Sequence, residues 1–345
     1  MRRLTKANER ERGAVAVIVA ILLVVLLGFA ALAVDMGMLY SEKAQLQNGA
    51  DAGALGIAQA CAKDTADPKC SGTSSLAKDL ADKNSLDGLS NVQSIALDVP
   101  NRKVTVTADP LEAGRTDNRV SLFFAGALGI PASSVVAKST VVWGSPSKGT
   151  TPFPLTMSVC QVKGMIDGAK QLIRSHTSNA NSDCPEGPSG SDTPGGFGWL
   201  AQDPSGCGAY IDLAINESGA DTGNDGPSHC NAILNGWAAD INAGKDVVIL
   251  LPVFKSVTGT GSGSSYDVHA FAAFKVRGWK FTGTSDLPLT FRNRAEHHPD
   301  KPSVECRGEC RGIIGQFVEY VALSSGYEEL GPVSEYGATV VKLTN

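Results

Sequence analysis

The sequence predicts an α+β protein with one N-terminal transmembrane helix, a helix-plus-sheet module and a β-rich, disulfide-containing domain. Three observations support this class. One long apolar stretch lies near the N-terminus, short alternating runs with turn residues follow it, and most of the cysteines lie in a Gly-rich and Ser-rich second half. The 345 residues are 42% hydrophobic and 19% charged. That composition excludes a disordered or coiled-coil chain and provides enough chain for one large or two ordinary domains.

The apolar stretch Ala14–Val34 reads AVAVIVAILLVVLLGFAALAV and contains neither charge nor proline. At about 1.5 Å of rise per residue, a helix of this length crosses the roughly 30 Å hydrocarbon core of a bilayer. Residues 14–34 are therefore predicted to form the transmembrane helix of a single-pass protein. The later run Val247–Phe254 is interrupted by Pro252 and better fits a buried strand.

Charge on the two sides of this stretch predicts its orientation. The preceding residues are mostly basic: Arg2, Arg3, Lys6, Arg10 and Arg12 stand against Glu9 and Glu11. By the positive-inside rule, residues 1–13 form a cytoplasmic tail, and the bulk of the chain is extracytoplasmic, at the cell (inner) membrane. The alternative is a cleavable signal peptide with an A-x-A site at Ala31–Ala33, although the apolar run is long for such a signal.

The apolar pattern continues beyond the stretch at helical spacing. Leu39, Leu46, Ala50, Ala54 and Ile57 mark one face of a helix that is predicted to run to about Ala60. Glu42 is expected to be exposed on the opposite face. Small residues keep the helix surface slim, namely Gly37, Ala44, Gly49, Ala52, Gly53 and Gly56. They could admit elements of other subunits or pack only against the chain's own sheet.

Residues Arg12–Ala60 resemble the N-terminal segment of the TadE/TadG-like family of Flp (tight adherence) pilus-assembly proteins. The residues that carry the resemblance are Gly13, Asp35, Gly37, Tyr40, Leu46, Gln47, Asn48, Ala50 and Asp51. A second stretch, Arg119–Val142, is similar to the family's later helix-then-strand segment. Some TadE-like pseudopilins have a cleavage-site glycine followed five residues later by Glu. Here Ile18 stands at that place after Gly13, so a retained anchor is expected.

The resemblance implies a membrane-anchored structural or assembly component of a bacterial Flp (Tad) pilus or tight-adherence secretion machinery. Its implied partners are other pilus-assembly and secretion subunits and the lipid bilayer, with homo- or hetero-oligomers possible. Some TadG-like proteins carry a von Willebrand-type adhesion domain, but the D-x-S-x-S metal signature of that domain is missing here. The alternative function is an anchored extracytoplasmic ligand-binding or hydrolytic protein.

Residues 35–148 are predicted to form the extracytoplasmic helix and a pilin-like α/β module. Val92–Val99 and Lys103–Ala108 are alternating runs separated by turn residues, which predicts a hairpin. Arg119–Leu128 reads as a short helix closed by Gly129, and Ser134–Trp143 reads as another strand. A sheet built from these strands would cover the apolar face of the long helix. The Gly- and Pro-containing stretch Gly144–Pro152 is predicted to be a linker.

Residues 149–345 are predicted to form the β-rich domain. The predicted strands are Phe153–Val162, Ala209–Ala214, Val247–Val253, Val268–Gly278 and Ile313–Leu323. Ala232–Ala243 could form a short helix, and polar connections such as Ser175–Pro194 separate the strands.

The eight cysteines are disulfide candidates because the chain is expected to lie mostly outside the cytosol. Cys61 and Cys70 are predicted to pair at the end of the long helix. The other six are Cys160, Cys184, Cys207, Cys230, Cys306 and Cys310, whose connectivity the sequence leaves open. The alternative for the last two is a zinc site with His297 and His298, although C-x3-C spacing is not a strong zinc signature.

Other motifs do not predict chemistry. A net charge of -5 gives no electrostatic footprint for nucleic acid. The calcium-like loop at Asp221 has Gly223 at its third position, and the Gly-rich loop Gly259–Gly263 lacks the lysine of a phosphate-binding loop. His176, His229 and His269 adjoin no catalytic motif. We therefore predict no enzyme activity, cofactor or metal, while a hydrolase with widely spaced carboxylates stays an alternative.

Overall fold

The computed structural model describes residues 9–162, 165–174, 198–215, 217–219, 221, 226–259, 264–323 and 326–344. The chain divides into two compact units. The first comprises Met1–Cys61, Ala66–Val141 and Leu343–Asn345, and the second comprises Ala62–Thr65 and Val142–Lys342.

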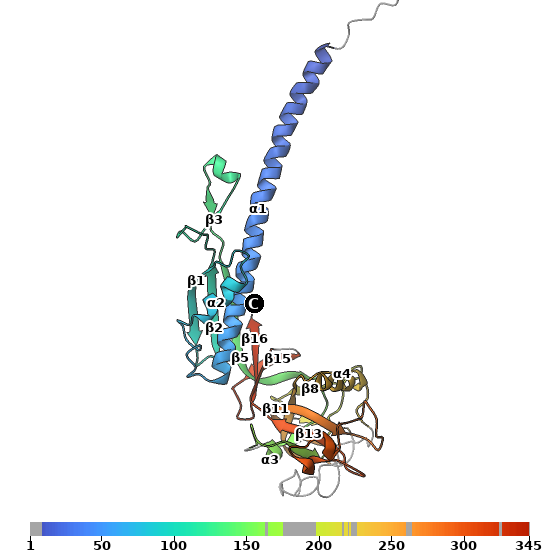
Figure 1. Ribbon diagram of the computed structural model, residues 1–345. Coiled ribbons are helices and arrows are strands. Elements are labelled where there is room, and N and C mark those ends of the chain that lie inside the picture. The colour runs from blue at the N-terminus through green and yellow to red at the C-terminus, as the bar shows by residue number, and fades with distance from the viewer. Residues whose placement is uncertain are drawn as a thin grey trace, which may run out of the picture. The chain divides into compact units, whose positions relative to one another are not determined.

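The first unit is built on one long helix, α1, which spans Glu9–Lys63 (Figure 1). It is the one helix in the described part of the chain that is long and apolar enough to cross a membrane. The side chains of residues 15–30 are exposed throughout, whereas Leu46, Ala50, Ala54 and Ile57 are buried. The predicted apolar face is therefore confirmed at these four positions, whereas Leu39 is only partly buried, and the face follows the 3.6-residue period of the helix.

A second helix, α2 (Leu76–Lys83), packs against α1 and was not predicted. The two backbones approach closely because the contact residues are small. A Cβ atom added at Gly49 would lie 3.0 Å from Ala81 Cα, and one at Gly53 would lie 3.2 Å from Ala77 Cα. Gly49 and Gly53 thus serve packing within the chain, against a helix rather than the expected sheet alone, whereas Gly37 and Ala44 are exposed.

The predicted hairpin is confirmed as β1 (Asn91–Asp98) and β2 (Lys103–Asp109), which pair antiparallel. In its turn, the Asn101 N–H donates to Asp98 Oδ1 at 3.1 Å. Inward residues of β2 alternate and are fully buried: Val104, Val106 and Ala108. The next strand in the sheet is β5 (Ala137–Thr151), whose first residues belong to this unit.

The predicted helix Arg119–Leu128 is wrong over most of its length. The chain forms a short two-stranded ribbon, β3 (Val120–Ser121) with β4 (Ala132–Ser133), and only Ala125–Leu128 forms a 3-10 turn, η1. Gly129 ends this turn with a φ of 87°, as the predicted closure requires. Gly126, which lies inside the predicted helix, disfavours a regular helix here.

The predicted linker Gly144–Pro152 is also wrong, because β5 continues through it to Thr151. The glycines in this stretch permit close strand contacts rather than a flexible connection. A Cβ atom at Gly144 would collide with the Gly331 carbonyl oxygen, and Gly149 has a φ of 144°. Within the second unit this part of β5 pairs with β8 (Ala209–Asp212) and β15 (Tyr327–Gly331).

The second unit is rich in strands, as predicted. One sheet has the order β6-β10-β11-β13-β7, and β9 and β12 also pair with β11. The bounds are β6 Met157–Ser158, β7 Gln171–Arg174, β9 Glu217–Gly219, β10 Val247–Thr258, β11 Ser265–Lys280, β12 Thr290–Phe291 and β13 Gly312–Phe317. Separately, β14 (Tyr320–Leu323) pairs parallel with β16 (Ala338–Thr344).

Helical segments cover parts of the second unit: α3 Val159–Val162, α4 Asn231–Asn242, η4 Ala295–His297 and η5 Pro302–Val304. The helix predicted at 232–243 is confirmed by α4. The predicted strand 153–162 is shorter, since β6 gives way to α3, and the predicted strand 313–323 is divided between β13 and β14. The predicted connection 175–194 lies outside the described residues.

Both faces of β10 are buried, which explains its nearly continuous apolar sequence. Ile249, Leu251 and Val253 belong to one hydrophobic cluster, whereas Leu250 and Phe254 belong to another. The first cluster contains fully buried Trp279, whose indole N–H donates to the Pro288 carbonyl at 2.8 Å. The buried strand predicted at 247–254 is therefore confirmed.

Candidate membrane and assembly segment

Residues 15–30 of α1 expose large apolar side chains on every side. Val24, Leu26 and Phe29 are each about two-thirds exposed, at 68%, 67% and 65%. A continuous apolar surface of this size is unfavourable in water and fits the hydrocarbon core of a bilayer. The residues predicted to span a membrane therefore have the surface that a membrane requires.

Asp35 lies directly after this apolar surface and is only 4% exposed. Its carboxylate accepts three backbone N–H groups. Oδ1 accepts from Phe123 at 2.9 Å and from Phe124 at 3.1 Å, and Oδ2 accepts from Ala125 at 2.6 Å. A carboxylate can accept on both oxygens, and such charge-assisted bonds are strong. Asp35 thus joins the end of the apolar stretch to the turn between β3 and β4.

The other residues that carry the family resemblance divide into two groups. Leu46 and Ala50 are buried, and the Gln47 side chain donates to Asp51 Oδ1 at 2.9 Å and to the Lys138 carbonyl at 3.3 Å. The hydrogen bond from Gln47 to the Lys138 carbonyl joins α1 to the start of β5. Gly37, Tyr40 and Asn48 form no such contact in the described structure, since Gly37 faces open space and Tyr40 and Asn48 are exposed. Gly13 lies in α1.

The expectation that Glu42 is exposed is wrong, because its side chain is partly buried. Burial raises the pKa of the Glu42 carboxyl, and repulsion from Asp87 and Glu112 raises this pKa further. Asp87 and Glu112 thus place two carboxylates near this side of α1. Because both residues are far from Glu42 in the sequence, the spacing of residues in α1 could not indicate them.

Replacing Glu42 with Gln is expected to stabilise the folded state at pH 7. The pKa of the Glu42 carboxyl is higher in the folded than in the unfolded state. Raising the pH from the unfolded-state pKa of about 4.3 through the folded-state pKa, the pH window in which the two states differ in protonation, therefore lowers the stability of the folded state. Glutamine removes this cost. Thermal unfolding of both proteins at acidic and neutral pH measures the effect, and the two curves should converge below the window. A Glu42→Gln variant that is less stable at pH 7 contradicts this account.

Three disulfides lie in the described residues. Cys61–Cys70 has a Cα–Cα distance of 4.8 Å, Cys207–Cys230 one of 4.6 Å, and Cys306–Cys310 one of 5.3 Å. Cys184 lies outside the described residues, as does the side chain of Cys160. Because Cys306 and Cys310 bond to each other, neither supplies a thiolate for zinc. His298 is buried, and its Nε2 lies 2.7 Å from the Arg292 carbonyl oxygen.

Removing the first of these bridges is expected to destabilise the end of α1. Cys61 and Cys70 are separated by 9 residues, and closing so short a loop stabilises by about 2–3 kcal/mol in the chain-entropy model. The double variant Cys61→Ser/Cys70→Ser should therefore unfold at a lower temperature, with the other bridges intact under non-reducing conditions. An unchanged unfolding midpoint would show that the bridge adds nothing to stability.

Lys280 is a buried charged residue that no pattern in the sequence indicated. Its Nζ donates to the carbonyl oxygens of Gly308 at 2.6 Å and Cys310 at 3.2 Å. Burial lowers the pKa of its ammonium group, and the nearby Arg311 lowers it further. Lys280 therefore braces the Cys306–Cys310 loop from β11. The long-range contact explains why no local pattern could indicate it.

The remaining candidate motifs are only partly described. Residues 222–225, residues 260–263 and His176 lie outside the described part of the chain. His269 lies 3.1 Å from the Val253 carbonyl oxygen through Nδ1 and 3.3 Å from the Tyr336 hydroxyl through Nε2. Burial lowers the pKa of the His269 imidazole, with a further contribution from Lys255. These contacts hold the ring within the second unit.

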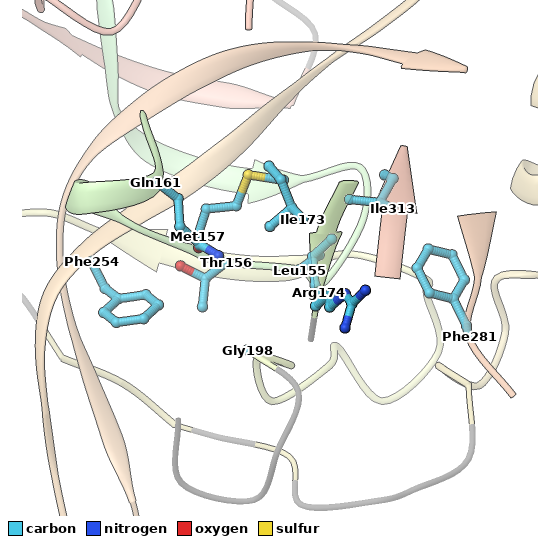
Figure 2. Close-up of a pocket in the computed structure, with 10 residues that line it drawn as sticks. All are labelled: Leu155, Thr156, Met157, Gln161, Ile173, Arg174, Gly198, Phe254, Phe281 and Ile313. Atoms are coloured by element: carbon cyan, nitrogen blue, oxygen red, sulfur yellow. The ribbon is translucent and has the colours of Figure 1, made fainter. Parts of the chain in front are cut away.

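Two hollows in the second unit bear on the alternative ligand-binding function. Figure 2 shows the smaller, where Met157 of β6, Ile173 of β7 and Ile313 of β13 lie around a cavity of about 20 Å³. This volume accommodates about one water molecule rather than an organic ligand. The larger hollow, of about 520 Å³, is open and gathers polar residues that include Asp286, Arg292, Glu296 and His297. Among the described residues, no Asp, Glu, His and Cys group could hold a metal ion.

Comparison with curated proteins and with solved structures finds no match for this chain. The comparison with protein families finds one match, and it lies within α1. The matched residues include the exposed apolar half of α1, Asp35 and the buried face that packs within the first unit. Residues 13–60 match the family model of Flp pilus-assembly TadE/G-like proteins, which confirms the resemblance for the N-terminal segment.

Proposed function

We propose that this protein is a membrane-anchored structural or assembly component of a bacterial Flp (Tad) pilus or tight-adherence secretion machinery. The observation that carries the proposal is the coincidence of the family match with one continuous helix. Residues 13–60 contain both the exposed apolar surface and the buried face of α1. Anchoring and folding are therefore combined in the segment that the family shares.

The proposed work is mechanical. The apolar half of α1 holds the protein in the cell membrane with its N-terminus in the cytoplasm, and the two folded units lie outside. The first unit would then act as a pilin-like module whose outward residues meet other subunits. Gly37, Ala44 and Asn48 are suited to such contacts because they lie on exposed parts of α1 beyond the span. Small residues at these places let a neighbouring helix approach closely.

Deletion of the gene in the native bacterium tests this function. We expect loss of surface pili and of adherence, both restored by the full-length protein. A complementing chain with the apolar residues 14–34 replaced by an unrelated transmembrane helix distinguishes anchoring from family-specific contacts within the bilayer. If deletion leaves piliation and adherence unchanged, the proposal fails and the anchored ligand-binding protein becomes the better explanation.

The proposed topology requires that the N-terminus is retained. Intact-mass measurement of the protein purified from native membranes should give the uncleaved chain, because the glutamate expected after a prepilin cleavage glycine is replaced by Ile18. A chain beginning at Ala14 would indicate pilin-type processing, and one beginning at Val34 would indicate signal-peptide removal. Either result contradicts the retained anchor.

A further inference from the structure

The turn between β3 and β4 exposes an apolar surface that the first unit does not cover. Phe123 is 75% exposed, Leu128 is 84% exposed and Ile130 is 58% exposed, with Phe124 partly exposed beside them. The rings of Phe123 and Phe124 contact each other edge to face, with centroids 4.9 Å apart. We define Phe123, Phe124, Leu128 and Ile130 as the apolar tip. Four such side chains on one short turn need an apolar surrounding.

The position of the apolar tip along α1 is set by Asp35. Its carboxylate accepts hydrogen bonds from the backbone N–H groups of Phe123 and Phe124, which belong to the tip, and of Ala125, which follows them in the same turn. Ala31, one helical turn earlier on the same face, is partly buried, whereas the side chains of residues 15–30 are all exposed. The tip therefore lies at the end of the apolar stretch. Figure 1 shows η1 beside α1, farther toward the N-terminal half of the helix than β1 and β2.

The charge pattern around the tip matches a bilayer surface. No Asp, Glu, Lys, Arg or His occurs from Val120 to Ala137, and an exposed Arg119 precedes this stretch. Phe and Leu side chains favour the boundary between headgroups and acyl chains, where the exposed cation of an arginine can meet lipid phosphates. A soluble partner would not explain why the tip is fastened at the level where the apolar stretch ends.

We propose that the apolar tip inserts into the outer boundary of the same bilayer leaflet from which α1 emerges, as a second membrane contact. This rests on the membrane anchoring in the proposed function. Two contacts instead of one would fix the rotation and tilt of α1 relative to the membrane, because a single helix can rotate freely about its axis. Asp35 would be the rigid connection between them.

Fluorescence quenching by brominated lipids tests the insertion in the full-length protein. The probe is Leu128→Trp, in liposomes of phosphatidylcholine brominated near the headgroup end of its acyl chains. The matched control is Leu86→Trp, at a leucine that is 87% exposed. The Leu86 N–H donates to Gln45 Oε1 at 2.6 Å, so Leu86 lies near a residue about 15 Å farther along α1 than Asp35. A third protein, Val24→Trp, reports on the span itself.

Emission is compared with that of the parent protein, which has 4 tryptophans. We expect the Leu128→Trp signal to lose most of its added emission and the Leu86→Trp signal to lose almost none. Val24→Trp is measured in liposomes whose lipids are brominated nearer the ends of the acyl chains. If Leu128→Trp and Leu86→Trp are quenched equally while Val24→Trp is strongly quenched, the tip proposal is overturned and the membrane anchor stands. An unquenched Val24→Trp overturns the anchoring, and the tip proposal with it.

Photo-crosslinking in cells separates lipid from protein as the occupant. A photoreactive amino acid at position 128 is well tolerated because the Leu128 side chain is exposed. Lipid adducts support insertion. Protein adducts in the absence of lipid adducts overturn it and identify the tip as a subunit contact.

Discussion

Ala50→Glu is expected to unfold the first unit, with a loss of about 3 kcal/mol or more in the free energy of unfolding. Ala50 has no exposed surface, and it lies on the buried face of α1 with Leu46 and Ala54. A glutamate there must either bury an unpaired carboxylate, become protonated or push α1 away from its neighbours. Each of these outcomes lowers the stability of the folded state.

Ala44→Glu is the matched control, because it introduces the same side chain and charge on an exposed position of the same helix. Its effect should lie within about 0.5 kcal/mol of the parent. Thermal unfolding followed by circular dichroism, together with limited proteolysis, compares the two purified full-length variants. Equal stability of Ala50→Glu and Ala44→Glu would falsify the burial of this helix face.

The same pair also separates folding from assembly in cells. With equal amounts of both variants in the membrane, Ala50→Glu should abolish piliation because the first unit is unfolded. A loss of piliation in Ala44→Glu, with its stability unchanged, would instead place a subunit contact on the exposed side of α1. Membrane fractions must be quantified first, since degradation of an unfolded variant gives the same phenotype.

The sequence predicted those elements whose signals are local and periodic. The apolar stretch 14–34, the buried face from Leu46 to Ile57 and the β1–β2 hairpin all follow from the spacing of apolar residues and from turn chemistry. The strand β10 was predictable because both of its faces are buried, which leaves a continuous apolar run. These patterns do not depend on a distant partner.

Elements that depend on distant partners were missed. Helix α2 is only 8 residues long, too short to show a reliable period, and it is stabilised by packing on Gly49 and Gly53. The glycines and prolines of residues 144–152 suggested a linker, but residues 144–151 belong to β5, which pairs with β8 and β15. Tertiary pairing overrides the local preference in both cases.

The candidate site likewise combines a feature with a local sequence signal and a contact with a distant partner. Asp35 was recognisable as a family residue, yet its hydrogen bond to the Phe123 N–H joins positions separated by 88 residues. The sequence contained one indirect signal, an uncharged stretch from Val120 to Ala137 that a surface loop does not need. Its first part, within Arg119–Leu128, was predicted to be a helix because short apolar runs do not distinguish a helix from an exposed apolar turn.

Gly49→Leu is expected to separate α2 from α1 and to lower the stability of the first unit. A Cβ atom at this position would lie 3.0 Å from Ala81 Cα and 3.2 Å from Ala81 Cβ. These are backbone and short side-chain atoms, which cannot rotate away, so the larger leucine must displace α2 itself. Overpacking of this kind costs about 1–3 kcal/mol or more, against a gain of at most about 1 kcal/mol in helix propensity.

Gly37→Leu is the matched control, because a side chain at Gly37 meets no atom within 4 Å. It should keep or slightly raise the stability of the folded protein, since leucine favours a helix more than glycine does. Urea unfolding of the two full-length variants and of the parent measures the difference, and Gly49→Leu should have the lower midpoint. If Gly49→Leu is as stable as Gly37→Leu, α2 does not depend on the glycine contact. Loss of piliation in a stable Gly37→Leu protein would show that Gly37 contacts another subunit. Loss of piliation in Gly49→Leu alone would show that Gly49 serves packing within the chain.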